Sequence, residues 1–502
     1  MADESGLSPY VFACEGGLVL DRSTFAMQPG MALELQNFEP DTKGGYRRIS
    51  GYEKWNTNIV PQDASASEKV LMSAYFNGDV IAARGGKVHK AAAGSGAWTE
   101  IDTGRTSAGK YTHFRYNLGG TDYIVWADGA NNASKYDGTT VTDLSATGAP
   151  ADPQYVTGFK DALFFAGMSS SSQEVVFTAP YTDSDFSVAN GAGSIAVDST
   201  ITGLFPFRDQ LYIFCEERIF RLVGNTVADF QLQPVTREIG CVNGFTIQEF
   251  AGDIVFLGPD GLRTVAGTER IGDVELGTIS RQIQPRFEGL SDVAEYDSVV
   301  IPDKTQYRIF FSDTDITRNN TKGVIAVRKG DAYEFADLRG IRPSSTDFIV
   351  SGGESIVLHG EYDGYVYRQE QGNDFDGNVI TGKYRSPDLS MGDAGIRKTF
   401  QRVIINYAPE AAVNADLFVR YDYEAPDVAR PAAYPFDTAT VVAIYGTSVY
   451  GTATYGGQSN PLVRQAIEGS GFAIALRVND RGASAPYSLR GFQLEFDAGA
   501  RR

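Results

Sequence analysis

Residues Phe207 to Cys215 run Phe-Arg-Asp-Gln-Leu-Tyr-Ile-Phe-Cys and carry the pattern from which the fold of this chain follows. An aromatic residue precedes a polar turn at Asp209, and an apolar run comes directly after it. Asp in a turn between apolar runs is typical of a β-hairpin. The run Leu211–Phe214 is apolar at consecutive positions, so both faces of its strand need cover that one hairpin cannot provide.

Copies of this pattern recur along the chain, with their polar turns roughly 40–50 residues apart, as expected for propeller blades. The other copies, two of them looser, are Tyr75–Ala83, Tyr116–Trp126, Phe159–Phe165, Phe250–Leu257, Asp303–Phe311 and Gly352–Leu358. Further hairpin turns follow at Gly85-Gly86, Asp137-Gly138, Glu216-Glu217, Asp260-Gly261 and Asp363-Gly364. The repeat predicts an all-β protein whose residues 61–375 form a β-propeller of about seven blades.

The chain changes character on either side of this repeat. Longer alternating strands at Phe400–Tyr407 and Ala415–Tyr423 predict that residues 376–502 form a C-terminal antiparallel β-sandwich. Residues 1–60 are broken by Pro and Gly into short extended pieces. They are expected to form an extended arm that packs on the propeller or on a neighbouring subunit.

Composition agrees with many short hairpins, because the chain has 55 Gly, 26 Tyr and 30 Phe but 6 Met. With 44 Lys and Arg against 63 Asp and Glu, the net charge is −19, which disfavours general phosphate binding. The three cysteines, Cys14, Cys215 and Cys241, are far apart, which argues against a disulfide framework and for folding in a reducing cytoplasm. Cys215 follows an apolar run and is expected to be a buried thiol. Neither a secretory signal nor a membrane-spanning run is predicted.

Three segments resemble the tail nozzle proteins of short-tailed bacteriophages, the family of tail tubular protein B and the DNA-stabilisation hub protein. These are the N-terminal run Glu15–Tyr52, the middle stretch Phe207–Ile283 and the closing strand Leu489–Phe496. The resemblance implies a virion tail protein that is assembled in the host cytoplasm. It implies a hexameric ring below the portal and head–tail adaptor, in which residues 1–60 contact the adaptor. Such a ring would extend the DNA channel without binding DNA specifically and would dock fibres or a tip protein.

Catalytic and cofactor motifs are scarce, so we assign no catalytic, cofactor-binding or metal residues. His89, His113 and His359 are far apart, and His89 and His359 are expected to face solvent near strand ends. There is no Gly-x-Ser-x-Gly elbow and no phosphate-binding loop. These observations indicate a protein that is not an enzyme.

A few polar or flexible segments leave alternatives open. The acidic clusters Asp374/Asp376 and Asp313/Asp315 are predicted to be hairpin turns, and the alternative is a bound cation. Arg47-Arg48 are predicted to lie on opposite faces of a strand, and the alternative is an anchor to an acidic neighbouring subunit. The stretch 444–457 is either a docking tip or a hairpin of the sandwich.

Two functions compete with the tail ring. The first is a receptor- or glycan-binding propeller of a tail fibre or cell surface, which would show a concave patch of tyrosine or tryptophan with polar groups. The second is a propeller glycosidase or lyase, which would need paired carboxylates that a sequence with 63 acidic residues cannot locate.

Overall fold

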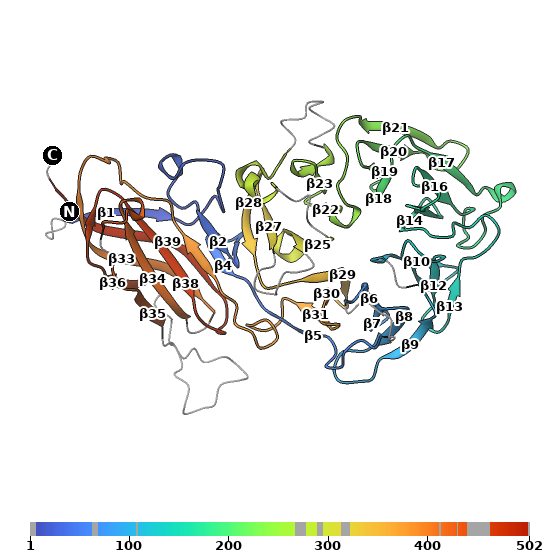
Figure 1. The fold of residues 1–502 in the computed structure, drawn as a ribbon, viewed down its shortest axis with the longest axis horizontal. Coiled ribbons are helices and arrows are strands. Elements are labelled where there is room, and N and C mark those ends of the chain that lie inside the picture. Colours follow the sequence, from blue (N-terminus) through green and yellow to red (C-terminus); the bar gives the residue numbers. More distant parts are fainter. Residues whose placement is uncertain are drawn as a thin grey trace.

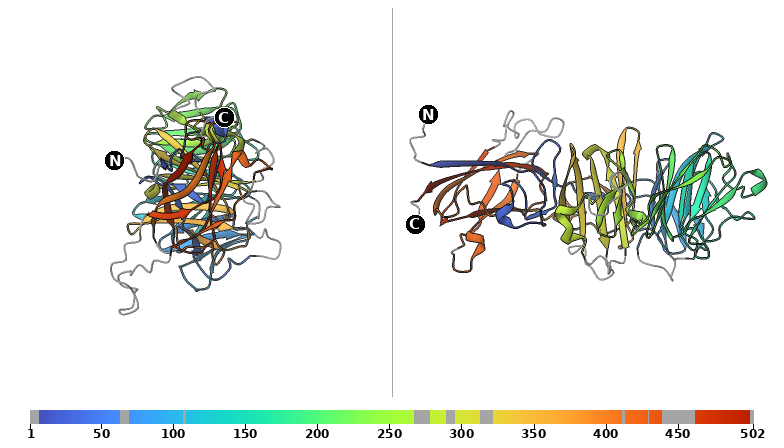
Figure 2. Two further views of the ribbon diagram at one scale, coloured as in Figure 1. Left: turned by 90° about the vertical axis from the view of Figure 1, so that its left-hand side faces the viewer. Right: turned by 90° about the horizontal axis from the view of Figure 1, so that it is seen from above.

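A computed structural model describes residues 7–62, 69–106, 109–266, 278–288, 295–312, 322–410, 413–428, 430–438 and 462–499. The chain is all-β, with a β-propeller at one end and additional sheets at the other (Figure 1). The two parts follow one another along the long axis of the molecule (Figure 2). The predicted all-β class and the presence of a propeller are thus confirmed.

Six blades of the propeller are separate sheets. The first comprises β6 (Met72–Phe76), β7 (Asp79–Arg84), β8 (Lys87–Ala91) and β9 (Thr99–Thr103). The second comprises β10 (Thr112–Leu118), β11 (Thr121–Ala127), β12 (Ser134–Tyr136) and β13 (Val141–Asp143). The third comprises β14 (Tyr155–Phe159), β15 (Ala162–Ala166), β16 (Glu174–Phe177) and β17 (Gly193–Ala196). The fourth comprises β18 (Ile201–Phe207), β19 (Gln210–Cys215), β20 (Ile219–Val223) and β21 (Gln231–Thr236).

The remaining two separate blades close the ring. One comprises β22 (Gln248–Phe250), β23 (Asp253–Gly258) and β24 (Gly261–Thr264). The other comprises β29 (Pro343–Ser351), β30 (Glu354–Glu361), β31 (Val366–Gln369) and, from the N-terminal segment, β5 (Tyr52–Lys54). Between them around the axis lie β25 (Glu295–Ile301), β26 (Gln306–Ser312), β27 (Lys322–Lys329) and β28 (Ala332–Leu338), which belong to a nine-stranded sheet.

Alternation along the second strand of a blade explains why the blades pack side by side. Leu211 and Ile213 of β19 are buried against the blade of β14–β17, whereas Tyr212 and Phe214 are buried against the blade of β22–β24. Both faces of the strand are therefore covered by neighbouring blades, as its apolar run predicts. The five additional hairpin turns predicted from the sequence each connect two paired antiparallel strands.

The additional sheets continue outward from the rim of the propeller (Figure 1). The nine-stranded sheet runs from β28 to β2 (Glu34–Gln36), β32 (Lys383–Arg385), β38 (Ile474–Asp480), β34 (Val413–Tyr421) and β35 (Tyr434–Thr438). The seven-stranded sheet contains β1 (Ser8–Ala13), β3 (Phe38–Pro40), β4 (Tyr46–Arg48), β33 (Lys398–Pro409), β36 (Leu462–Ala466), β37 (Ser470–Gly471) and β39 (Tyr487–Ala498). Aromatic residues join the two sheets, for example Tyr384, whose ring stacks on Phe492 with 5.7 Å between centroids.

The N-terminal segment contributes strands to both parts of the molecule. β1, β3 and β4 pair within the seven-stranded sheet, β2 lies between β28 and β32, and β5 forms the outer edge of the last blade. Short 3₁₀ helices connect strands elsewhere: η1 (Thr24–Ala26), η2 (Val188–Asn190), η3 (Gly244–Thr246), η4 (Arg281–Arg286), η6 (Pro302–Lys304) and η8 (Asp422–Glu424). Within the described residues, no helix has the length and apolar character needed to cross a membrane.

The three cysteines are free thiols, as their spacing predicts, and all three are buried, as expected for Cys215. Burial raises the pKa of Cys215 and of Cys241 to about 12. Both thiols are therefore protonated at neutral pH and pack as small apolar side chains.

Candidate functional site

The axis of the propeller contains a cavity of about 800 Å³. Its walls come from the innermost strands of the blades, β6, β10, β14, β18, β22, β25 and β29. A cavity of this size can hold a small molecule, so it is the first place to look for a functional site.

Ion pairs cross this cavity between blades that are not neighbours. Lys110, just before β10, extends to Asp297 on β25, with 2.6 Å between Nζ and Oδ2. The same Nζ donates to the carbonyl of Tyr296 and lies 4.3 Å from the ring centroid of Phe245. Burial lowers the pKa of Lys110, and the neighbouring Asp297 carboxylate offsets part of that effect.

Asp347 on β29 forms the second connection. Its carboxylate lies 3.2 Å from His113 Nε2, pairs with the Arg115 guanidinium and accepts the backbone N–H of Tyr75 at 2.8 Å. Burial raises the pKa of Asp347, but Arg115, His113 and the Tyr75 N–H lower it more, to about 2. The side chain is thus a carboxylate at neutral pH and does not supply a proton as a general acid.

Hydroxyl groups in the same wall form hydrogen bonds with other protein groups of the wall. Ser345 Oγ lies 3.0 Å from Ser73 Oγ, and Ser298 Oγ donates to the carbonyl of Phe245 at 2.7 Å. Thr346 Oγ1 donates to Asp297 at 2.8 Å. These hydroxyl groups thus have hydrogen-bond partners in neighbouring blades. Together with the two ion-pair connections they form an axial network that links the blades to one another.

The Asp347 carboxylate of this axial network is expected to make the stability of the protein depend on pH in acid. The pKa of Asp347 is about 2 in the folded protein against an ordinary value of 3.8. Stabilisation by the ionised carboxylate is therefore fully present above about pH 4 and is lost as the pH falls through about 2, a change of about 2 kcal/mol. Urea denaturation of the wild type and of Asp347→Asn is expected to show a stability gap that shrinks by this amount between pH 4 and pH 2. Asp209→Asn, which alters a carboxylate that is 95 % exposed, is the control. A gap for Asp347→Asn that stays constant over this range contradicts the prediction.

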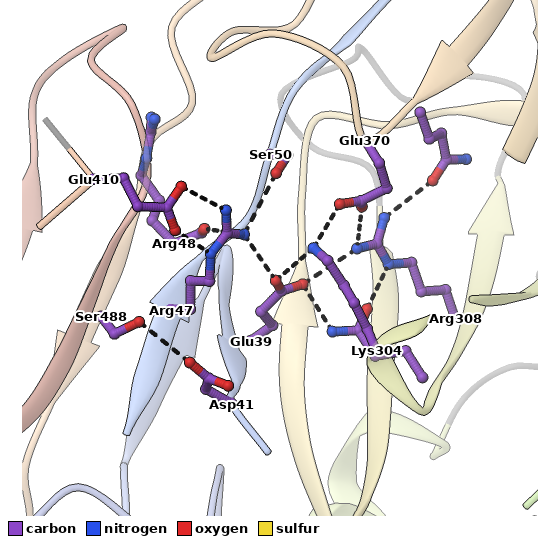
Figure 3. A network of polar contacts seen from close by, with 12 residues as sticks. Glu39, Asp41, Arg47, Arg48, Ser50, Lys304, Arg308, Glu370, Glu410 and Ser488 are labelled. Atoms are coloured by element: carbon purple, nitrogen blue, oxygen red, sulfur yellow. Dashed lines mark hydrogen bonds and ion pairs between the residues drawn. The ribbon is translucent and has the colours of Figure 1, made fainter. Parts of the chain in front are cut away.

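A second polar network joins the propeller to the additional sheets (Figure 3). Glu39 on β3 is 3 % exposed and lies at its centre. Its carboxylate accepts from Lys304 Nζ at 2.6 Å, from Gln306 Nε2 at 2.8 Å and from Arg308 Nη2 at 3.2 Å, all on the propeller side. Arg47 Nη1 donates to the same carboxylate at 3.2 Å from the side of the additional sheets.

Glu370, just after β31, shares two of these cations. Lys304 Nζ and Arg308 Nη2 lie 2.5 and 2.6 Å from its carboxylate oxygens. Burial raises the pKa of Glu370, but the two cations lower it more, to about 2. The network therefore consists of two carboxylates that hold the same two cations between them.

Arg47 and Arg48 lie on opposite faces of β4, as predicted. The Arg47 side chain is 19 % exposed and pairs with Glu410 at 2.7 Å as well as with Glu39. The Arg48 side chain is fully buried, pairs with Asp480 and donates to the carbonyl of Gly482 at 3.1 Å. Both guanidinium groups are thus occupied by partners in their own chain.

The expectation that His89 and His359 face solvent is wrong. His89 is 3 % exposed and His359 is fully buried, because both lie in the third or second strand of a blade, β8 and β30, where neighbouring blades cover the sheet. His359 packs between aromatic rings, stacked on Tyr367 and edge-to-face with Tyr52. Burial lowers the pKa of His89.

The acidic cluster at Asp374 and Asp376 forms a turn. Asp374 Oδ1 accepts the N–H of Gly377 at 2.7 Å, and Asp376 pairs with Lys54 at 2.8 Å. Among the residues that the structure describes, no three His, Cys, Asp or Glu side chains converge in a way that could hold a metal ion. The cluster at Asp313 and Asp315 and the stretch 444–457 lie outside the described residues.

Sequence reasoning named His113 and Arg47 but neither their partners nor the other residues of the two networks. Lys110 and Asp297 are 187 positions apart, and Glu39 and Arg308 are 269 apart. The available signal was a charged side chain next to or inside an apolar strand, such as Asp347 between Thr346 and Phe348. That signal marks a buried polar group but does not name its partner.

Comparison with known proteins identifies no family for this chain. No family model and no curated protein matches the chain. Among solved structures, an ancestral GH74 enzyme is 10 % identical with a TM-score of 0.38, covering 64 % of this chain and 51 % of that one. The N-terminal domain of Nup159 is 10 % identical with a TM-score of 0.38, covering 67 % and 97 %. PorZ, a surface component of the type-IX secretion system of Porphyromonas gingivalis, is 13 % identical with a TM-score of 0.35, covering 78 % and 46 %.

The chain thus spans about half the length of the GH74 enzyme and of PorZ.

Proposed function

We propose that this protein is a structural component of a short-tailed bacteriophage tail and forms a ring, the nozzle or hub, below the portal and adaptor. The observation that carries the proposal is the position of the segment whose sequence resembles the nozzle family, Glu15–Tyr52. This segment supplies β2, β3 and β4 to the additional sheets and contains Glu39, which binds cations of the propeller. It therefore connects the two parts of the molecule.

The finer architecture follows from the same proposal. β25–β28 serve as a seventh blade, and the additional sheets form a C-terminal sandwich. The functional units are residues 1–60 as the adaptor-contact segment, 61–375 as the propeller and 376–502 as the nozzle platform. The protein is not an enzyme, and it functions in the virion tail after assembly in the host cytoplasm.

The DNA channel of the ring lies between protomers. The axial cavity of one propeller measures about 800 Å³ and is crossed by the Lys110–Asp297 pair. A duplex whose major groove alone is about 12 Å wide does not fit there. A net charge of −19 supports a channel wall that repels DNA and lets it slide through without binding.

Negative-stain imaging of the purified chain mixed with a candidate head–tail adaptor tests the proposal. We expect sixfold rings that cap the adaptor, and docking of fibres or a tip protein at the opposite end. Persistent monomers in the presence of the adaptor would overturn the ring. Tight DNA binding by the free ring at low salt would overturn the passive channel, because attraction to phosphates strengthens as salt falls.

A further inference from the structure

A row of four side chains crosses the outer face of the nine-stranded sheet, the face turned away from the seven-stranded sheet. The row consists of Glu34 on β2, Arg385 on β32, Arg477 on β38 and Phe418 on β34, which lie directly opposite one another on paired strands. Tyr384, the neighbour of Arg385 along β32, points to the inner face and is fully buried. Arg385 and Arg477 are therefore like charges directly opposite each other, which destabilises a sheet unless anions offset them.

Arg420 brings a third guanidinium group to this face. It follows Phe418 by two positions on β34, so both side chains lie on the same face, with 5.4 Å between the guanidinium and the Phe418 ring centroid. Its Nη1 donates to the carbonyl of Val419 at 2.9 Å. Among the residues that the structure describes, Arg420 pairs with no carboxylate.

Further guanidinium groups lie close enough to Arg420 to repel it. Burial lowers the pKa of Arg420, whereas the Glu424 carboxylate raises it. The guanidinium groups of Arg430, Arg477 and Arg385 lower it further. The four arginines thus form one electrostatic cluster, which additional negative charge would stabilise.

The carboxylates of this surface offset only part of its positive charge. Arg477 pairs with Glu34, whose carboxylate also lies 3.8 Å from Lys383 Nζ. Arg385 pairs with Glu424 at 3.3 Å. We call the five cations of this surface the basic face: Lys383, Arg385, Arg420, Arg430 and Arg477.

Two further carboxylates nearby leave this excess in place. Asp416 is paired with Arg481 at 2.9 Å. Asp388 is 7 % exposed, and burial raises its pKa, an effect that Arg385 partly offsets. Even with Asp388 ionised, the five cations of the basic face outnumber the three carboxylates around them.

The excess of cations contrasts with the charge of the remaining chain. Residues 376–502 hold 13 Lys and Arg and 13 Asp and Glu, so the net charge of −19 resides in residues 1–375. All five cations of the basic face belong to residues 376–502. The basic face is therefore a local attractor for anions on a molecule that repels them elsewhere.

The turn that follows β34 is strained and borders the basic face. Asp422, Tyr423 and Glu424 have φ angles of 47°, 59° and 58°, in the left-handed region that non-glycine residues rarely adopt. Asp422 Oδ1 fixes the turn by accepting the N–H groups of Phe472 at 2.6 Å and Ala473 at 3.1 Å. The Tyr423 side chain remains 47 % exposed. Strained residues held in place by their surroundings are typical of functional segments.

We propose that the basic face binds an extended acidic segment of a partner protein. The row from Glu34 to Phe418 crosses three gaps between strands, about 14 Å in all, which an extended chain covers in about four to five residues. Carboxylates of such a segment can form bidentate pairs with the guanidinium groups, and Tyr423 offers an aromatic contact of the kind that anchors protein interfaces. This binding goes beyond the ring and does not depend on it.

Duplex DNA fits this surface less well than a short acidic segment does. It carries one negative charge per about 1.7 Å of its axis, along its whole length. A duplex therefore extends past the basic face onto the surface of residues 1–375, which hold the net charge of −19 and repel it. A short peptide contacts the basic face alone.

Fluorescence anisotropy of the isolated chain with labelled probes tests the proposal. The probes are octa-glutamate, octa-glutamine and a short DNA duplex. We expect octa-glutamate to bind with a Kd of about 100 µM or below at low salt, and more weakly at about 0.5 M salt. Arg420→Glu is expected to weaken binding at least tenfold, because it reverses a charge that has no carboxylate partner in the described part of the chain. Arg430→Glu is a second variant at an exposed position and is expected to act in the same direction.

Arg402→Glu is the matched control. Arg402 is 47 % exposed on β33 of the seven-stranded sheet, so the same charge reversal there is expected to leave binding unchanged. The proposal is overturned if octa-glutamate does not bind at about 1 mM, or binds no better than octa-glutamine. It is equally overturned if Arg420→Glu and Arg430→Glu bind like the wild type, if Arg402→Glu weakens binding as much, or if the duplex binds more tightly than octa-glutamate. Ring formation is measured separately, so each proposal can fail alone.

Discussion

Replacing Glu39 by Gln is expected to lower the free energy of unfolding by about 3–5 kcal/mol, the cost of breaking a buried ion pair from one side. The carboxylate is 3 % exposed and accepts from Lys304, Gln306 and Arg308. Arg308 is itself 1 % exposed, so removing the charge of Glu39 leaves a buried guanidinium with less compensation. Chemical denaturation followed by circular dichroism measures the change, and hydrogen exchange is expected to place it at β3 and β26.

Glu410→Gln is the matched control for this prediction. Glu410 pairs with the same network through Arg47, but its side chain is 47 % exposed. An exposed pair of this kind contributes about 0–1 kcal/mol. If Glu39→Gln costs no more than Glu410→Gln, the Glu39 network does not hold the two parts of the molecule together.

The blades could be predicted from the sequence because their signals are local. In Phe207–Cys215 the aromatic residue, the turn and the doubly apolar strand all lie within nine residues, and each hairpin pairs neighbours in sequence. The same holds for β33 and β34, whose alternating pattern marks a half-buried sheet. Short-range patterning therefore predicted the all-β class and the hairpins of the blades.

Contacts between distant residues could not be predicted in the same way. The ion pair of Lys110 with Asp297 crosses the propeller axis, and it exists only once the blades have closed into a ring. His359 was expected at an exposed strand end, yet it is buried, and one of the aromatic rings that cover it, Tyr52, comes from β5 about 300 positions earlier in the chain. A charged or polar side chain in an apolar strand indicates a buried group with a hydrogen-bond partner. Which residue is the partner depends on how the blades pack in the folded protein.

The pairing of β5 with β31 also joins distant parts of the chain, and Tyr52 supplies its apolar contacts. β5 comes from the N-terminal segment and completes a blade whose other strands lie about 300 residues later, with Tyr52 opposite Gln369. The Tyr52 ring is fully buried and stacks on Phe375 with 4.9 Å between centroids. It also meets the rings of His359 and Tyr367 edge-to-face.

Tyr52→Ala is therefore expected to cost about 3–5 kcal/mol of unfolding free energy, as truncation of a buried aromatic residue does. Tyr52→Phe keeps the ring and removes the hydroxyl, whose hydrogen bonds to Gly340 and Glu361 are long, at 3.4 and 3.5 Å. It is expected to cost about 1 kcal/mol. Lys54→Ala changes the same strand at a half-buried position and is expected to cost less than about 1 kcal/mol. Urea denaturation measures all three, and limited proteolysis after residue 54 reports whether β5 has left the blade. If Tyr52→Ala is as stable as Lys54→Ala, then the pairing of β5 does not contribute to the stability of the propeller. The N-terminal segment then does not connect the two parts of the molecule through this strand.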